Sequence, residues 1–243
     1  MKSKIIINCD LGEGTNNEEA LMPYIQACNI ACGGHTGDEV SMRSVMQLAK
    51  KHEVKIGAHP SYPDTENFGR LSLNISEEEL IETIQSQLQV FEEIAFKENI
   101  EWQHIKPHGA LYNDLAKDEK LTNTFLKAIE KYKQNMNLYV PYGSIIAEEA
   151  KKQGFKILYE AFADRAYNDD RSLVSRKLPN SVLTNKNEIL NQVANIAEEG
   201  FVWSVQRNRV PIKATTFCVH SDTENSEDIV KFLYSNLQAV NIE

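Results

Sequence analysis

The sequence predicts one α/β domain in which seven parallel strands close into a (β/α)7 barrel. Short apolar runs alternate with capped, amphipathic segments along the chain, which is typical of a mainly parallel sheet. Polar residues follow nearly every run, whereas an open sheet gathers them at one crevice, so the pattern favours a closed barrel. No linker, low-complexity tract or charge block divides residues 1–243, and we therefore expect a single domain over that whole range.

The expected strands are short apolar runs that end in polar residues. They span residues 4–9, 27–32, 54–58, 102–106, 137–140, 156–161 and 215–220. Pro107 follows the fourth run, and because proline cannot donate to a central ladder, that strand should end beside it. Lys106 and His108 are therefore expected at a strand end, where parallel α/β folds bind their ligands.

The expected helices combine capping residues with one apolar face. Asp38 is placed to cap the first helix, and Ser76 with Glu79 forms a capping-box pattern at the next. Gly154 should stop a helix over residues 144–152. Further helices are expected through residues 121–132, 188–199 and 227–237.

Residues 162–185 interrupt the alternation of strands and helices. The stretch is polar and shows no helical pattern, although the apolar pair Val182 and Leu183 indicates a brief strand. A long stretch of this kind is often a functional lid, and we expect that role here.

Composition narrows the function classes. Hydrophobic residues make up 42% of the 243-residue chain, which is enough for a substantial core. The formal net charge of −9 argues against nucleic acid or an anionic membrane surface as a partner. No apolar run approaches the ~18 residues that span a bilayer, and nothing in Met1–Lys4 resembles a signal peptide, so we expect a cytoplasmic protein.

The four cysteines are interpreted as buried thiols in a reducing compartment. They are Cys9, Cys28, Cys32 and Cys218. Cys28 and Cys32 lie on one expected strand, where four residues span roughly 13 Å, too far for a shared tetrahedral zinc ion.

Alternation along the strands separates an apolar face from a polar one. Asp10 lies opposite Cys9 in the first strand. Lys106 likewise lies opposite Ile105 in the fourth strand. In a closed barrel the polar face lines the lumen. Burying this many ionisable groups is costly, which indicates that they have a function. The expected lumen cluster comprises Asp10, Asn29, His59, Lys106, His108 and His220.

Some of these polar residues also have a structural interpretation. A single histidine near a strand is more often structural than catalytic, and we favour that interpretation for His52 and His104. Lys106 either pairs with a carboxylate or clamps an anion. Arg70 and Arg165 either form surface ion pairs or recognise a substrate carboxylate.

Six motifs carry a resemblance to a known family. They are Asn8–Glu13, Asn29–His35, Gly57–Asp64, Lys106–Asn113, Glu160–Tyr167 and Cys218–Asp222. In this order, and in register over essentially the whole chain, they resemble the LamB/YcsF family of 5-oxoprolinase A subunits. The resemblance implies a TIM-like barrel similar to that of glycoside hydrolases and polysaccharide deacetylases, which agrees with the independent strand count. Departures from the family pattern, such as Gly34 and Ser221, affect pocket shape rather than the ionisable residues.

The resemblance also implies an activity and partners. The implied reaction is the ATP-dependent opening of 5-oxo-L-proline, or pyroglutamate, to L-glutamate, catalysed by a hydrolase acting on a cyclic amide. It implies two further subunits, B and C, and ATP with magnesium. The sequence contains no Gly-x-x-x-x-Gly-Lys phosphate loop, so we expect those subunits to share the handling of the nucleotide.

We expect lactam binding and ring opening to take place in this chain. Asp10 or Glu13 is the hypothesised general base for water, and His59 or His108 is the proton shuttle. Lys106 would steady the developing oxyanion. The expected substrate-binding residues are Asn29, His35, Arg70, Arg165 and His220, of which the two arginines would hold the substrate carboxylate.

Two alternatives remain open at this point. A metal-dependent amidase or deacetylase on the same barrel is one, since Asp10, His35 and His59 offer a carboxylate and two imidazoles to a divalent metal. The other is a subunit that binds the lactam without catalysing its hydrolysis. The sequence leaves the binding of a metal by this chain undecided.

Overall fold

Parallel pairing closes the main sheet on itself, as the sequence pattern predicts. The strand order is β1-β2-β3-β4-β5-β6-β9, and β9 pairs with both β6 and β1. The computed structural model describes residues 5–240. The barrel strands are β1 (Ile6–Leu11), β2 (Ala27–Ala31), β3 (Lys55–His59), β4 (His104–Ile105), β5 (Asn137–Pro141), β6 (Lys156–Phe162) and β9 (Thr216–Cys218). The seven-stranded barrel is therefore confirmed.

The strand ends differ from the expected ones by one or two residues. Strand β1 runs on through Leu11, because Asp10 and Leu11 still pair with β2. Strand β4 has only two residues, fewer than the five expected, although the backbone N–H groups of Gln103 and Lys106 on either side still donate to β3. Strand β9 ends at Cys218, and the backbone N–H of His220 instead donates to the side chain of Asp164 at 3.0 Å. Lys4, in the first expected strand, lies outside the described residues.

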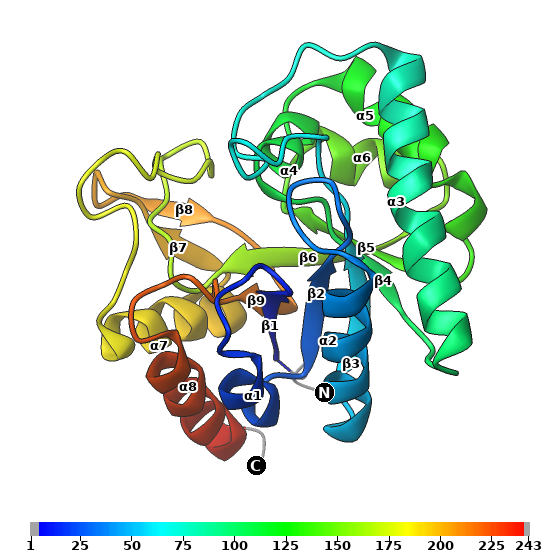
Figure 1. Ribbon diagram of the computed structural model, residues 1–243. Helices are drawn as coiled ribbons and strands as arrows, with labels where there is room; N and C mark the ends of the chain where they lie inside the picture. Colours follow the sequence, from blue (N-terminus) through cyan, green and yellow to red (C-terminus); the bar gives the residue numbers. More distant parts are fainter. Residues whose placement is uncertain (1–4, 241–243) are drawn as a thin grey trace.

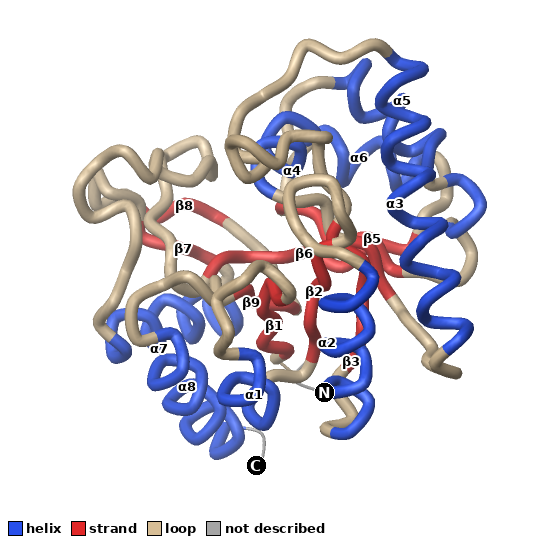
Figure 2. Tube along the Cα trace, in the orientation of Figure 1, coloured by secondary structure: helices blue, strands red, loops and turns tan. Residues whose placement is uncertain are grey.

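Helices cover the outside of the barrel in two groups (Figures 1 and 2). Their bounds are α1 (Glu18–Leu21), α2 (Glu39–Lys51), α3 (Glu77–Lys97), α4 (Gly109–Leu115), α5 (Glu119–Ala128), α6 (Ile145–Lys152), α7 (Lys186–Ala194) and α8 (Ser226–Val240), with single short turns η1 (Met22–Tyr24), η2 (Glu130–Tyr132) and η3 (Asn195–Glu199). Helices α2, α3, α5 and α6 pack in sequence on one side, and α7, α8 and α1 pack on the other. No helix among residues 5–240 is long and apolar enough to span a membrane.

Capping residues set the helix starts as expected. The side chain of Asp38, the N-cap of α2, accepts a hydrogen bond from the backbone N–H of Ser41. The backbone N–H of Asp38 in turn donates to the hydroxyl of Ser41. Ser76 accepts from the backbone of Glu79 and begins α3. The elements that were not expected from the sequence are α1 with η1, helix α4, and the antiparallel hairpin of β7 (Phe201–Trp203) with β8 (Arg209–Pro211).

Strand β6 includes Phe162, and the remaining residues 163–185 have no helix and only isolated bridges, one of which joins Arg165 to Val182. Several residues of this stretch line the cavity at the carboxyl ends of the strands. This stretch therefore lies next to the cavity, while its role as a lid stays a prediction.

The barrel lumen contains polar side chains, whereas apolar side chains pack between strands and helices. His104 stands in the lumen, stacked on Tyr139 with ring centroids 4.2 Å apart, and its Nε2 bonds to Asn29 at 2.7 Å. Burial lowers the pKa of His104 to about 3, so the ring is neutral and structural, as expected. Gly57 makes this position possible, because a Cβ there would lie 2.2 Å from the His104 ring.

We predict that Gly57→Ala destabilises the fold by about 1–3 kcal/mol through overpacking against His104. Chemical denaturation measures this loss. In a His104→Ala background the same substitution should cost clearly less, because the ring that it strikes is gone. Equal costs of Gly57→Ala in the two backgrounds would contradict this account of the lumen.

Candidate active site

A cavity of about 740 Å³ opens at the carboxyl ends of the barrel strands. Its volume lies in the range of small-molecule sites. Acidic, imidazole and ammonium groups form the floor, and the mouth carries several cations. The floor includes Asp10, Glu13, His59, Lys106, His108 and Glu160, and the mouth includes Arg70, Arg165, Arg171, Arg176 and Lys177. The concentration of cations at this mouth contrasts with the acidic chain as a whole.

Lys106 lies between two carboxylates inside the barrel. Its Nζ is 2.9 Å from Asp10 Oδ1 and 3.1 Å from Glu160 Oε1, and its side chain is 2% exposed. Burial alone would lower the pKa of Lys106, but the negative charges of Asp10 and Glu160 outweigh it and hold the pKa well above its usual value. Lys106 is therefore a permanent cation at neutral pH.

Asp10 is held as a carboxylate by its surroundings. It accepts hydrogen bonds from Asn29 at 2.7 Å and from Lys106, and His59 Nε2 is 3.5 Å from its Oδ2. Burial would raise the pKa of Asp10, yet the positive charges of His59 and Lys106 outweigh burial and hold that pKa well below the usual range.

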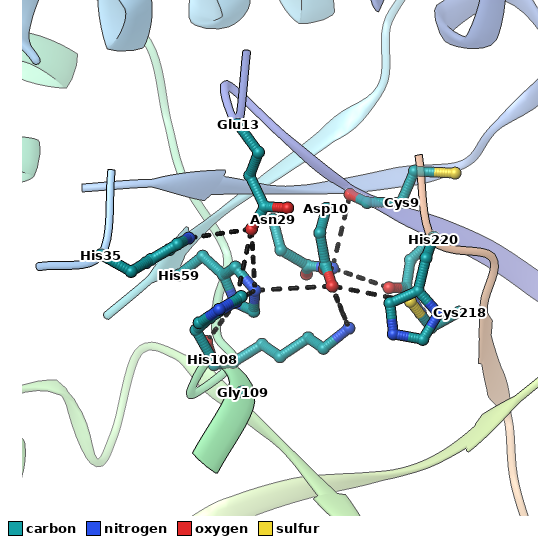
Figure 3. Close-up of polar contacts among 12 residues, drawn as sticks. Cys9, Asp10, Glu13, Asn29, His35, His59, His108, Gly109, Cys218 and His220 are labelled. Atoms are coloured by element: carbon teal, nitrogen blue, oxygen red, sulfur yellow. Dashed lines mark hydrogen bonds and ion pairs between the residues drawn. The ribbon is translucent and has the colours of Figure 1, made fainter. Parts of the chain in front are cut away.

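Three histidines surround Glu13 beside this ion pair (Figure 3). Glu13 Oε1 is 2.8 Å from His35 Nε2, 3.3 Å from His108 Nδ1 and 3.8 Å from His59 Nε2. His35 and His108 stack with ring centroids 3.6 Å apart. Burial would raise the pKa of Glu13, but the bonds to His108 and His35 lower it far below the usual value.

The ring pKa values differ among the three histidines. Burial lowers the pKa of His35 to about 4 and also lowers that of His108. Burial opposes the charged form of His59 too, but the negative charge of Asp10 outweighs it and raises the pKa of His59. Among these three rings, a proton therefore resides preferentially on His59.

Glu160 and Tyr112 are neighbouring residues that line the cavity, and each has one buried polar atom without a close hydrogen-bond partner in the described part of the chain. Glu160 Oε2 and the Tyr112 hydroxyl are buried, and neither has a hydrogen-bond partner among the described residues. Burial raises the pKa of Tyr112 well above its usual value, and the charge of Glu160 raises it further. Buried polar atoms without partners are costly, which makes both atoms candidates for ligand contacts.

The structure divides the expected site residues into two layers. All of the expected catalytic set, together with Arg70, Arg165 and His220, line the cavity. Asn29 and His35 lie beneath the floor instead and are almost completely buried. There Asn29 bonds to Asp10, and His35 bonds to Glu13, so both orient a group that faces the cavity.

The two arginines differ in how they are held. Arg70 forms an ion pair with Asp222 at 2.7 Å and is largely exposed. Arg165 is buried, with Nε donating to Ser181 O at 3.2 Å and Nη2 donating to Val174 O at 2.7 Å. Backbone carbonyls therefore fix the guanidinium of Arg165 at the cavity wall.

Sequence reasoning missed three residues of this site. Glu160 neutralises Lys106, Tyr112 lies next to Glu160, and Asp164 holds His220 through Nδ1 at 3.0 Å. Glu160 and Asp164 fall in one of the six motifs, and Glu160 lies at the end of an expected strand. Its position at a strand end, where site residues are expected, was the sequence signal that could have identified Glu160. Tyr112 follows a strand end on a helix that was not expected, so no strand pattern pointed to it.

Comparison with known proteins places the chain in a family. The model of the LamB/YcsF family matches residues 5–243. The chain belongs to the LamB/YcsF family. A LamB/YcsF relative from Thermococcus sibiricus, named as the A subunit of 5-oxoprolinase, is 40% identical over 99% of this chain and 96% of its own length. A relative of the same name from Haemophilus influenzae is 37% identical over 99% of this chain and 98% of its own length.

Solved structures agree with the fold of this LamB/YcsF chain. The lactam utilization protein from Thermus thermophilus superposes with a TM-score of 0.90 at 29% identity, over 99% of this chain and 98% of its own. A GH113 β-1,4-mannanase shares the fold, with a TM-score of 0.54 at 11% identity and 98% of both chains covered. The expected family and TIM-like (β/α)7 barrel are both confirmed.

We predict that Lys106→Met destabilises the protein by about 3–5 kcal/mol, because it leaves Asp10 and Glu160 buried without their cation. Denaturant titration at pH 7 measures the loss. Adding Glu160→Gln to Lys106→Met should recover part of it, since one uncompensated charge is removed.

The matched control is Lys120→Met, which breaks an exposed ion pair with Glu77 and should cost less than about 1 kcal/mol. If Lys106→Met were no more costly than Lys120→Met, the buried pairing described above would be wrong.

Proposed function

We propose that this LamB/YcsF protein binds 5-oxo-L-proline in the cavity and opens its ring to L-glutamate, as one of the subunits of an ATP-dependent 5-oxoprolinase. The observation that carries the proposal is the carboxylate of Glu160 on the cavity floor: its Oε1 pairs with Lys106 Nζ, while its Oε2 has no hydrogen-bond partner among the described residues. A five-membered lactam has a cis amide, with its C=O and N–H on the same side of the ring. An ammonium donor next to a carboxylate acceptor matches that edge.

The substrate carboxylate has partners at the mouth. Among the contacts of the described residues, Arg165 uses Nε and Nη2 for backbone carbonyls, which leaves Nη1 for a ligand. Arg70 and Arg176 share Asp222 and add positive charge nearby. Because guanidinium groups bind carboxylates in a directed way, we assign the substrate carboxylate to Arg165, with Arg70 in support.

Ring opening requires an activated water and stabilisation of the developing oxyanion. Lys106 has three N–H donors, of which Asp10 and Glu160 occupy two, and the third can reach a lactam oxygen in the cavity. The polar atoms of Glu13, His59 and His108 converge beside it and form the water-activating group. Asp10 remains charged and keeps Lys106 in place.

Nucleotide chemistry is assigned to partner subunits. The sequence contains no phosphate loop of the Gly-x-x-x-x-Gly-Lys type, and the relatives bear the name of one component of a larger enzyme. We propose that two further subunits, B and C, bind ATP with magnesium and activate the lactam oxygen, in the cytoplasm. Activation is required because a lactam is a resonance-stabilised amide.

The test is a glutamate assay on the three subunits singly, in pairs and together. We predict that this chain alone releases no glutamate from 5-oxoproline, with or without ATP and magnesium. The complete set should release glutamate with ADP in step. Its rate should fall by roughly 100-fold or more when this chain carries His108→Ala, the loss expected for an acid–base group.

Circular dichroism of the His108→Ala chain is the control for folding. Glutamate release by this chain alone, without ATP, would contradict the division of labour. It would support a self-sufficient metal-dependent amidase, for which the convergence of Glu13, His59 and His108 is the favouring observation.

A further inference from the structure

Three electron-rich atoms face one another at the cavity floor. His59 Nε2 and His108 Nδ1 are 3.0 Å apart, and Glu13 Oε1 is 3.8 Å from the first and 3.3 Å from the second (Figure 3). All three side chains are nearly buried, yet each lines the cavity. The atoms are therefore close to each other and accessible from one side.

Backbone carbonyls fix the tautomers of both imidazoles. His59 Nδ1 is 2.7 Å from the carbonyl oxygen of Lys106, and His108 Nε2 is 3.0 Å from that of Phe68. A carbonyl oxygen only accepts hydrogen bonds, so each of these ring nitrogens carries the proton. In the neutral rings, the lone pairs then lie on His59 Nε2 and His108 Nδ1, the two atoms that face each other.

This arrangement favours positive charge between the three atoms, because two lone pairs and a carboxylate oxygen at such distances repel. A single proton, such as the one that His59 preferentially carries, bridges only one pair of them. A divalent cation can satisfy all three. Metal-binding histidines in proteins are commonly oriented by a hydrogen bond from the other ring nitrogen to a carbonyl oxygen, as His59 and His108 are here. The Glu13 carboxylate is likewise oriented by a hydrogen bond, with His35 Nε2 at 2.8 Å.

We propose that Glu13, His59 and His108 form a divalent-cation site whose remaining coordination positions face the cavity. Two imidazoles and one carboxylate suit zinc, and they also suit manganese, iron or cobalt. This set differs from the expected trio of Asp10, His35 and His59. It retains His59, but Asp10 is neutralised by Lys106, and His35 lies behind Glu13 with its Nε2 directed at that carboxylate.

A second convergent group fits a cation less well. Asp10, Cys218 and His220 also lie within reach of one another. There, however, Asp10 already pairs with Lys106, and His220 Nδ1 bonds to Asp164 at 3.0 Å. Burial also raises the pKa of the Cys218 thiol well above its usual value, which disfavours the thiolate that metals bind.

The cation site belongs to this chain alone and does not depend on the proposed lactam chemistry. A cation held there would lower the pKa of a bound water and polarise a carbonyl in the cavity. Glu13, His59 and His108 would hold the ion, while Lys106 would keep its place on the oxyanion side of the same floor.

The experiment measures metal binding without substrate or partner subunits. Untagged protein is stripped with a chelator, dialysed against zinc chloride and, separately, manganese chloride, and analysed for bound metal by mass spectrometry. We expect one ion per chain for at least one of the two metals. Glu13→Gln and His108→Ala should each weaken its binding by roughly 100-fold or more, since each removes a ligand.

Two control variants locate the site. His52→Ala removes a histidine at the C-terminal end of α2 that lies outside the cavity lining, and it should leave binding unchanged. His220→Ala should also leave it unchanged, because His220 belongs to the second group. Circular dichroism confirms that each variant is folded.

The proposal is overturned if neither metal binds at 1:1, if Glu13→Gln and His108→Ala both bind like wild type, or if His220→Ala alone abolishes binding. Because glutamate release is not measured, a failure of the lactam proposal would leave these results unaffected. Conversely, the absence of bound metal would overturn the cation site and leave the lactam proposal to its own glutamate assay.

Discussion

The buried ammonium of Lys106 is the interaction on which the candidate site depends. It pairs with both Asp10 and Glu160 inside the barrel, where two carboxylates held away from water without a cation would be strongly destabilising. Asp10 in turn stands 3.5 Å from His59, so the charge of Lys106 also influences the histidine group around Glu13. Ion pair and histidine group share one cavity floor because adjacent parallel strands deliver their ends to the same rim.

Much of this arrangement could be predicted from the sequence, because barrel strands follow a simple rule. Side chains alternate between lumen and helix layer, so parity alone placed Asp10, His59 and Lys106 together. Proline and glycine punctuation located most strand ends to within two residues. The family resemblance rests on the motifs that these strand ends carry, which is why fold and family agree.

The remainder depends on contacts that no local pattern encodes. Glu160 is paired with Lys106 across the barrel, and their positions are 54 residues apart (160 minus 106). His35 shares the parity of the lumen set, yet the turn after β2 places it behind Glu13 rather than in the cavity. The β7–β8 hairpin comprises only two three-residue strands, too short for a periodic signal.

The central claim is that Lys106 and Glu160 together recognise the lactam edge. A crystal structure of this chain with 5-oxo-L-proline tests that claim most directly. The account predicts the lactam oxygen about 3 Å from Lys106 Nζ, the ring N–H at a similar distance from Glu160 Oε2, and the substrate carboxylate against Arg165. A lactam bound in the cavity with its amide edge turned away from Lys106 and Glu160, or bound outside the cavity, would contradict it.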